Sequence, residues 1–158
     1  MDEPIVRPAV EGDLPYVAAA WRNLQNYHVN LGLAFPLQSD SHDKWLASFQ
    51  RTLGRFSFLW VAEDKGQAKA FLLARVKQSP AFLGGVQVGE ISDLYVDDDL
   101  RGSGVGTRLV SAAMDKFRVL KVHSVEVQIQ AGNETGLDFW HKLGFKQDLT
   151  LVRKTLSD

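Results

Sequence analysis

The sequence predicts one α/β domain over residues 1–158, in which helices and strands are interleaved. Three observations support this. The chain has 158 residues, of which 45% are hydrophobic and 23% are charged, so it can bury one core without disulfides or a structural metal. Segments with helical spacing of apolar residues alternate with segments that have strand patterns. Between residues 86 and 130, a strand, a glycine-rich loop, a helix and a further strand follow one another.

The first third of the chain predicts a short strand and two helices. Residues 5–9 form the strand, and Asp13 is expected to cap a helix that has Pro15 in its first turn. Apolar residues then keep helical spacing at Val17, Ala20, Trp21, Leu24 and Tyr27. A second helix is expected over residues 43–53, ended by Gly54.

Three long strands are expected next. Residues 56–63 and 68–76 are apolar, aromatic-rich runs, and residues 64–67 between them favour a β-hairpin with Gly66 at positive φ. Residues 86–96 form the third long strand.

The last part of the chain predicts two helices and further strands. One helix begins at the glycine-rich loop, with a buried stripe at Val105, Leu109, Ala112, Ala113, Phe117 and Leu120. Residues 124–130 alternate between apolar and polar, as a strand does. Asn133 is expected to cap the last helix, and Gly144 to end it in the left-handed conformation. Residues 145–156 are expected to supply terminal strand material.

Charge and composition exclude several classes of protein. There are 18 Lys and Arg against 19 Asp and Glu, so no overall basic field attracts nucleic acid or an acidic membrane. With no cysteine, the chain has no disulfide, no thiolate metal site and no cysteine nucleophile. The four histidines show no paired ligand spacing, so no metal is expected. No apolar stretch has transmembrane length, and we expect a cytoplasmic protein.

The glycine-rich loop, residues 101–106, is the strongest chemical signal. A strand followed by such a loop and a helix exposes unpaired backbone N–H groups beside the positive end of a helix dipole, which suits a pyrophosphate. A β-carbon at Gly102, Gly104 or Gly106 would hold phosphates away from these groups. A dinucleotide fingerprint would need glycine at Thr107, and the Gly-Lys-Ser/Thr of a P-loop is absent. The alternative is that three glycines simply make a turn.

The context of this loop resembles the acetyl-CoA-binding motif of the GNAT superfamily. The strand sequence ISDLYV of residues 91–96 precedes Arg101-x-x-Gly104-x-Gly106. Downstream, Asn133 and the sequence FWHKLGF of residues 139–145 resemble the helix that follows in that family. The resemblance covers nearly the whole chain.

The resemblance implies a strongly bent mixed sheet flanked by helices, with the strand ending at Val96 and the strand of residues 124–130 splayed apart around pantetheine. It implies an N-acetyltransferase that moves an acetyl group from acetyl-CoA to a primary amine of a small molecule or peptide by direct attack in a ternary complex. The alternative is a GNAT-like module that binds acyl-CoA with weak or no catalysis. The residues implied to contact the cofactor are Leu94, Tyr95, Val96, Arg101, Gly102, Ser103, Gly104, Val105, Gly106, Thr107, Asn133, Phe139 and Trp140.

Acetyl transfer needs a group that removes a proton from the amine, because an alkylamine is mostly protonated near pH 7. Glu90 matches the position of the catalytic glutamate in histone-acetyltransferase-like members of the superfamily. Asp93 and solvent are the alternatives. Strand alternation places Glu90 and Asp93 on opposite faces unless a bulge lies between them.

Trp140 stands where many members of the superfamily have a tyrosine that protonates the departing thiolate. An indole has no proton to give, so solvent is expected to do this, and a packing role for Trp140 is the alternative. The resemblance also implies acceptor contacts at Tyr27, His28 and Phe35. The expected partners are the amine and a second copy of the chain, with no nucleic acid and no membrane.

Overall fold

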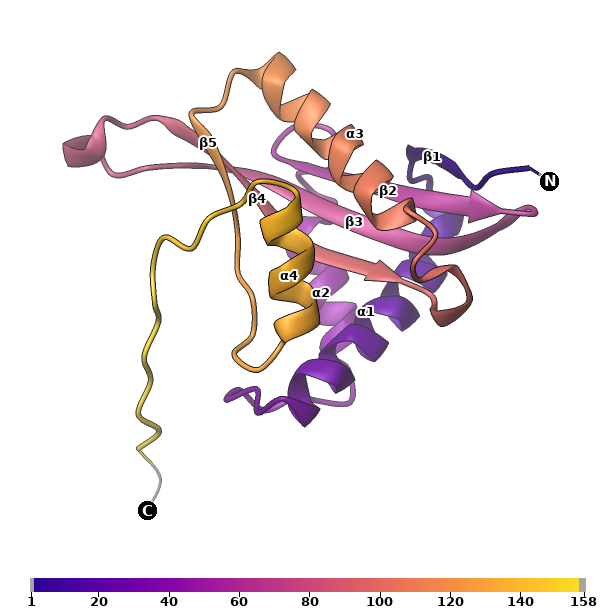
Figure 1. Cartoon of the computed structure of the whole chain (residues 1–158), viewed down its shortest axis with the longest axis horizontal. Coiled ribbons are helices and arrows are strands. Elements are labelled where there is room, and N and C mark those ends of the chain that lie inside the picture. The colour runs from indigo at the N-terminus through magenta and orange to yellow at the C-terminus, as the bar shows by residue number, and fades with distance from the viewer. Residues whose placement is uncertain (1, 157–158) are drawn as a thin grey trace.

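The computed structural model describes residues 2–156, and over these it contains one open five-stranded sheet with four α-helices (Figure 1). The strand order is β1-β2-β3-β4-β5. Neighbouring strands are antiparallel except β4 and β5, which are parallel. The strands are β1 (Ile5–Pro8), β2 (Ser57–Asp64), β3 (Gln67–Gln78), β4 (Gln87–Val96) and β5 (Ser124–Val127). This mixed sheet confirms the predicted fold class.

The α-helices cover both faces of the sheet (Figure 1). They are α1 (Leu14–Asn30), α2 (Ser41–Gln50), α3 (Val105–Leu120) and α4 (Glu134–Lys142). Helices α1 and α2 pack on one side, which we call the α1/α2 face, and α3 and α4 pack on the other, the α3/α4 face. None of the described helices is both long and apolar enough to cross a bilayer.

The central strand β3 contributes to a core on each face. Phe71 and Leu73 pack on the α1/α2 face, whereas Leu72 and Ala74 pack on the α3/α4 face, and none of the four is exposed. A strand buried on both sides reads as a continuous apolar run, which is the pattern of residues 68–76. Each large apolar side chain buried in this way stabilises the fold by roughly 1.5–3 kcal/mol.

The hairpin between β2 and β3 forms as predicted. Lys65 has φ 52° and Gly66 has φ 80°, so both central residues of the turn are left-handed. This is the two-residue turn whose twist matches that of the flanking strands, and it favours glycine at its second position.

The prediction that the Asp13 side chain caps α1 is wrong. Its side chain makes no hydrogen bond to α1. Instead Asp13 accepts from the backbone N–H of Val10 at 2.7 Å and pairs with Arg7 at 2.8 Å. The pair of Arg7 with Asp13 therefore links β1 to the start of α1, and Arg7 also contacts Glu63 of β2 at 3.2 Å. The Arg7 guanidinium holds the pKa of Asp13 below its usual range, against the opposing effect of burial.

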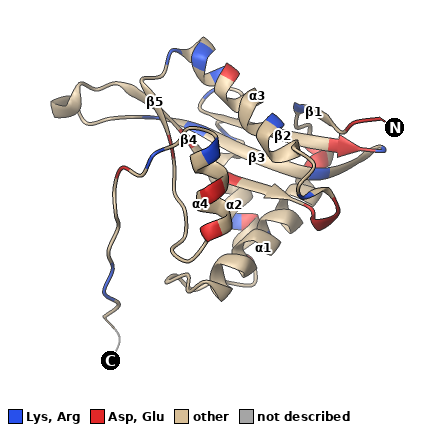
Figure 2. Ribbon diagram, in the orientation of Figure 1, with Lys and Arg blue, Asp and Glu red and all other residues tan. Residues whose placement is uncertain are grey.

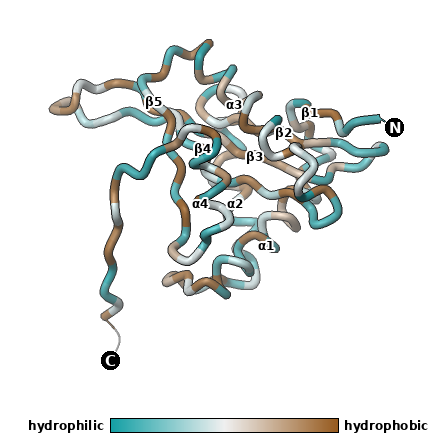
Figure 3. Tube along the Cα trace, in the orientation of Figure 1, coloured by the Kyte–Doolittle hydropathy of each residue, from teal (hydrophilic) through white to brown (hydrophobic). Residues whose placement is uncertain are grey.

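Three predicted segments differ from the structure by more than small shifts of strand ends. Helix α2 begins two residues before the predicted start at residue 43. It ends at Gln50 instead of residue 53, because the chain turns before Gly54. Strand β5 stops at Val127 instead of residue 130, because its pairing with β4 ends there. Residues 145–156 form no strand, although Figure 3 shows apolar stretches along them. Strand formation needs a neighbouring strand, and in Figure 1 this segment runs away from the sheet.

Candidate functional site

Strands β4 and β5 diverge as the predicted fold requires. They pair only from Val88 with Ser124 to Ile91 with Val127. Residues 93–96 of β4 therefore pair with β3 along one edge, and residues 92–96 have no strand along the other. This leaves backbone hydrogen-bonding groups at that edge for an extended ligand.

The loop between β4 and α3 contains several backbone N–H groups without an acceptor among the described residues. Gly102 has φ 79° and Gly104, the residue before α3, has φ 88°. A β-carbon at either position would meet no atom within 4 Å. Within residues 2–156, five backbone N–H groups of this segment have no hydrogen-bond acceptor: those of Gly102, Gly104, Val105, Gly106 and Thr107. Free donors at a helix N-terminus fit the pyrophosphate of a coenzyme A.

Phe139 of α4 lies against the first turn of α3. A β-carbon on Gly106 would be 3.5 Å from the Phe139 ring and 3.8 Å from a methyl group of Val96. The first turn of α3 therefore lies close to α4 and to the end of β4, at a distance where a β-carbon would make ordinary contacts. The predicted cofactor residues of the loop, β4 and α4 are thus neighbours in the structure.

Trp140 belongs to the core on the α3/α4 face. It is only 6% exposed, and its ring packs edge-on between Phe139 and Phe145, with ring centres 5.1 Å from each. This environment supports the packing role. Contact between Trp140 and the cofactor stays a prediction.

The Arg101 side chain contacts the end of β4 and the residues that follow it. Its Nε donates to the Val96 carbonyl at 3.0 Å, and its Nη1 lies 3.2 Å from Asp98. The guanidinium also lies 5.6 Å from the centre of the Tyr95 ring. The Val96 carbonyl therefore already accepts a hydrogen bond from within the chain. Figure 2 shows that the start of this loop, residues 97–99, is acidic.

A β-bulge places Glu90 and Asp93 on the same face of the sheet. The register of β3 with β4 changes from Leu73 opposite Asp93 to Ala74 opposite Ile91, so Ser92 is the extra residue. Glu90 lies opposite Arg75, which shares the α1/α2 face with Leu73. Without this bulge the two carboxylates would point to opposite faces.

Glu90 is held by a lysine from the neighbouring strand. Lys77 Nζ lies 3.1 Å from Glu90 and also contacts Glu126, the residue opposite Glu90 on β5. The hydrogen bond to Glu126, aided by that to Glu90, raises the pKa of Lys77. The Glu90 side chain is 20% exposed, so water reaches it.

Asp93 lies in a more enclosed environment beside α2. Burial raises the pKa of Asp93 to about 6, while the Ser92 hydroxyl, Arg75 and the indole of Trp45 favour its charged form and limit the rise. Trp45 is itself fixed by stacking on Trp21, with ring centres 5.0 Å apart. Asp93 therefore keeps its proton to a higher pH than an ordinary aspartate does.

Tyr27 and Asn133, predicted to contact acceptor and cofactor, meet in the structure. The Tyr27 hydroxyl donates to Asn133 Oδ1 at 3.2 Å, and the same oxygen accepts from the Gly136 backbone at 2.9 Å. Asn133 therefore caps α4, as predicted, and links it to the end of α1. Burial lowers the pKa of the neighbouring His28. Phe35 lies apart from these residues, 62% exposed, under the guanidinium of Arg153.

The contact between Tyr16 and Asp97 could not be predicted from the sequence. The Tyr16 hydroxyl donates a hydrogen bond of 2.7 Å to Asp97. This bond links α1 to the residue that directly follows β4. Burial, together with this hydrogen bond, raises the pKa of Tyr16 above its usual range. The two residues are 81 positions apart, and no local pattern predicts such a pair.

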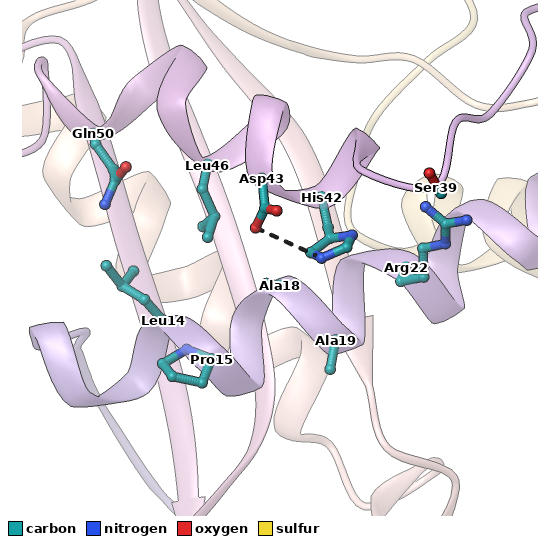
Figure 4. Close-up of a pocket in the computed structure, with 10 residues that line it drawn as sticks. All are labelled: Leu14, Pro15, Ala18, Ala19, Arg22, Ser39, His42, Asp43, Leu46 and Gln50. Atoms are coloured by element: carbon teal, nitrogen blue, oxygen red, sulfur yellow. Dashed lines mark ion pairs between the residues drawn. The ribbon is translucent and has the colours of Figure 1, made fainter.

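Two surface hollows lie away from the loop. One, of about 700 Å³, is a groove between α1 and α2 that contains Arg22, His42 and Asp43 (Figure 4). The other, of about 560 Å³, lies beside β1 and β2 and includes Lys116. Neither includes Glu90, Asp93 or the glycine-rich loop. Among residues 2–156 there is no cluster of three His, Asp or Glu side chains that could hold a metal ion.

Solved structures with the same fold include acetyltransferases. A tetramutant of the BH1408 protein from Bacillus halodurans is 25% identical, with a TM-score of 0.82, and the match covers 96% of this chain and 99% of that one. A predicted acetyltransferase from Clostridium acetobutylicum, solved with acetyl-CoA, is 16% identical with a TM-score of 0.78, over 98% of this chain and 97% of that one.

Two curated relatives are acetyltransferases. An uncharacterized N-acetyltransferase of Methanocaldococcus jannaschii is 33% identical over 61 residues, which are 39% of this chain and only 27% of that protein. The L-methionine sulfoximine/L-methionine sulfone acetyltransferase of Pseudomonas aeruginosa is 22% identical over 142 residues, which are 89% of this chain and 79% of that protein.

The family model "Acetyltransferase (GNAT) family" matches residues 21–145, which include the glycine-rich loop, the diverging strands and α4. The protein therefore belongs to the GNAT family of acetyltransferases, and it is an acyltransferase that uses acetyl-CoA.

Proposed function

We propose that the enzyme transfers the acetyl group of acetyl-CoA to a primary amine of a small molecule by direct attack in a ternary complex. The observation that carries this proposal is the pair of carboxylates, Glu90 and Asp93, on one face of β4 where that strand leaves β5. A base at this point is within reach of an amine that approaches the unpaired edge of β4.

Glu90 is the proposed general base. Its side chain reaches solvent, so an amine or a bridging water has access to it. Asp93 is more enclosed by α2 and is the second candidate. In the reaction, the amine nitrogen forms a bond to the acetyl carbonyl carbon as the carbon–sulfur bond breaks. The amine proton passes to the Glu90 carboxylate, and the departing thiolate takes a proton from solvent.

The chain's own backbone binds and orients the cofactor in this proposal. The free N–H groups that begin at Gly102 bind the pyrophosphate, and the unpaired edge of residues 92–96 binds the pantetheine amides. Acetyl-CoA supplies the activated acetyl group. Because Trp140 is buried and its indole has no proton to give, no protein group is assigned to protonate the thiolate.

A small amine is the favoured acceptor. The Pseudomonas aeruginosa relative acetylates L-methionine sulfoximine and L-methionine sulfone, which are small amines. Tyr27 and His28, at the end of α1 next to Asn133, remain the proposed acceptor contacts, because they lie where α1 meets the start of α4.

A thiol-release assay with acetyl-CoA and a panel of amines tests this function. Release of free CoA that depends on the amine, together with an acetylated product by mass spectrometry, is the expected result. If acetyl-CoA binds but no amine in the panel is acetylated, the chain acts as an acyl-CoA-binding module and the proposal is wrong.

A second copy of the chain is the proposed partner of the C-terminal segment, residues 145–156. This segment exposes four large apolar side chains by 73% to 88%: Leu149, Leu151, Val152 and Leu156. Contact with a second copy would remove this apolar surface from water. Sedimentation equilibrium is expected to show a dimer that Leu151→Asp weakens; a native monomer would contradict the proposal.

A further inference from the structure

Arg75 is a charged residue without a charged partner on the face that carries Glu90. It lies on β3 directly opposite Glu90, and two residues from Lys77 on the same strand. Lys77 contacts both Glu90 and Glu126. Within residues 2–156, no carboxylate oxygen lies within 4.0 Å of the Arg75 guanidinium. Two carboxylates of this face, Glu90 and Glu126, therefore pair with Lys77 and not with Arg75.

The hydrogen bonds of Arg75 are also incomplete. Its Nη2 reaches only the Ser48 hydroxyl, at the long distance of 3.5 Å. Its Nε is buried and has no hydrogen-bond partner among the described residues. A guanidinium carries five N–H donors in a planar fork, and leaving such donors unpaired away from water is unfavourable. The Nη2 contact with Ser48 is exposed, so an anion from outside the chain can reach the guanidinium there.

The surroundings of Arg75 hold its guanidinium in place. The guanidinium carbon lies 6.0 Å from the centre of the Phe49 ring on α2, and Ser48 is its neighbour on the same helix. Asp93 is close enough for Arg75 to act on its pKa, but the two make no ion pair within 4.0 Å. An arginine held between an aromatic ring and a strand is suited to bind a planar carboxylate through two parallel hydrogen bonds.

We propose that Arg75 binds the carboxylate of the acceptor, and that the acceptor is therefore a free α-amino acid. This inference rests on the proposed function, because it places the amine of the same molecule at Glu90. Residues directly opposite on antiparallel strands have β-carbons about 5 Å apart. In an α-amino acid the amine and the carboxylate share one carbon, so both groups reach their partners on the two strands at once.

This geometry selects against other amines. A polyamine has no carboxylate, and the first residue of a peptide has an amide in its place. Either would leave the Arg75 guanidinium unpaired in the complex. Discrimination of this kind is strong when a binding site is left with an unsatisfied polar group.

Binding to the enzyme in complex with CoA tests the subsite without relying on turnover. L-amino acids, each paired with its α-amide, are titrated calorimetrically into enzyme saturated with CoA. Equilibrium binding avoids the difference in amine reactivity between an acid and its amide. We expect at least one free acid to bind about 10-fold or more tightly than its amide, as a charge-assisted hydrogen bond to arginine predicts.

Variants of Arg75 test whether the preference for the free acid over its amide depends on this residue. Arg75→Gln is expected to remove it, and Arg75→Lys to retain only part, because lysine keeps the charge and loses the planar fork. Arg118→Gln is the matched control, because Arg118 is exposed on α3 and pairs with Asp115. It is expected to keep the full preference. CoA affinity and melting temperature check that each variant is folded, and if Arg75→Gln does not fold, the reduced preference must appear in Arg75→Lys.

The outcomes separate this inference from the proposed function. Equal binding of acid and amide to native enzyme, or binding of neither, overturns the carboxylate subsite. So does a preference that survives in folded Arg75→Gln. If an amino acid binds with the expected preference and is not acetylated when acetyl-CoA replaces CoA, the subsite stands and the proposed transfer to that amine is wrong.

Discussion

Glu90 and Asp93 face the same side of β4 although three positions separate them, because Ser92 is the extra residue of a β-bulge. An even number of positions normally separates residues on one face of a strand. The bulge therefore brings two carboxylates to the point where β4 leaves β5. It also aligns Asp93 with Trp45 of α2, which gives this carboxylate its enclosed environment.

The environment of Asp93 predicts an unusual pH dependence of stability. Burial raises the pKa of Asp93 from 3.8 to about 6, so between these values the folded state binds more protons than the unfolded state. The contribution of this group to the free energy of unfolding therefore falls as pH rises from about 4 to 6, and stays low above that range. Asp93→Asn removes this loss.

Urea unfolding of the native enzyme and Asp93→Asn at pH 4 and pH 7 measures the effect. We expect the difference in unfolding free energy to shift in favour of Asp93→Asn between the two pH values. Asp115→Asn, an exposed residue of α3, is the control and should show no such shift. A shift of opposite sign would mean that Asp93 is stabilised as a carboxylate in the fold.

Gly106→Val tests the cofactor loop with the least disturbance of the backbone. Gly104 has φ 88°, so a side chain there is strained, whereas Gly106 is helical. Its β-carbon would make an ordinary 3.5 Å contact with Phe139. The two further methyl groups of valine would crowd Phe139 and Val96 beside the free N–H groups of the helix start, and we expect CoA affinity to fall by about 10-fold or more.

The control for this variant is Gly12→Ala, because a β-carbon at position 12 meets no atom within 4 Å and lies far from the loop in sequence. Isothermal titration with CoA compares the two folded proteins. Unchanged affinity in Gly106→Val would remove the loop from the pyrophosphate site.

Trp140→Phe is expected to lower the stability of the fold, with a smaller effect on turnover than the loss of a general acid or base would have. The indole is 6% exposed between two phenylalanine rings, and a smaller ring leaves a void, at a cost of about 1–3 kcal/mol in unfolding free energy. Turnover is expected to fall by less than ~10²-fold, the low end for a general acid or base. Chemical denaturation and the thiol-release assay give the two numbers. Normal stability and acetyl-CoA binding with almost no turnover would show that the indole N–H has an essential role.

Much of the fold follows from local sequence signals. The helices, the Lys65-Gly66 turn and the α4 cap at Asn133 follow from periodicity and turn chemistry, which depend on neighbouring residues. The glycine-rich loop follows from backbone requirements in the same way. The candidate site was less predictable, because the Ser92 bulge is set by the pairing of β4 with β3, and strand pairing is not local.

Long-range contacts account for what the sequence did not reveal. Tyr16 contacts Asp97, and Arg75 lies opposite Glu90, only when the sheet and helices are assembled. The C-terminal segment was wrongly expected to be a strand because its composition suits one, but no strand of the sheet lies beside residues 145–156. Composition alone does not supply that partner.

The rate of amine-dependent CoA release by Glu90→Gln as a function of pH tests the central claim most directly. If Glu90 takes the amine proton, kcat at pH 7 should fall by about 10²-fold or more, with acetyl-CoA affinity unchanged. The defect should shrink toward pH 9–10, because the free amine becomes abundant there, and Asp93→Asn should show a smaller loss. A loss in Glu90→Gln that is the same at every pH, or no loss at all, would contradict the assignment of Glu90 as the base.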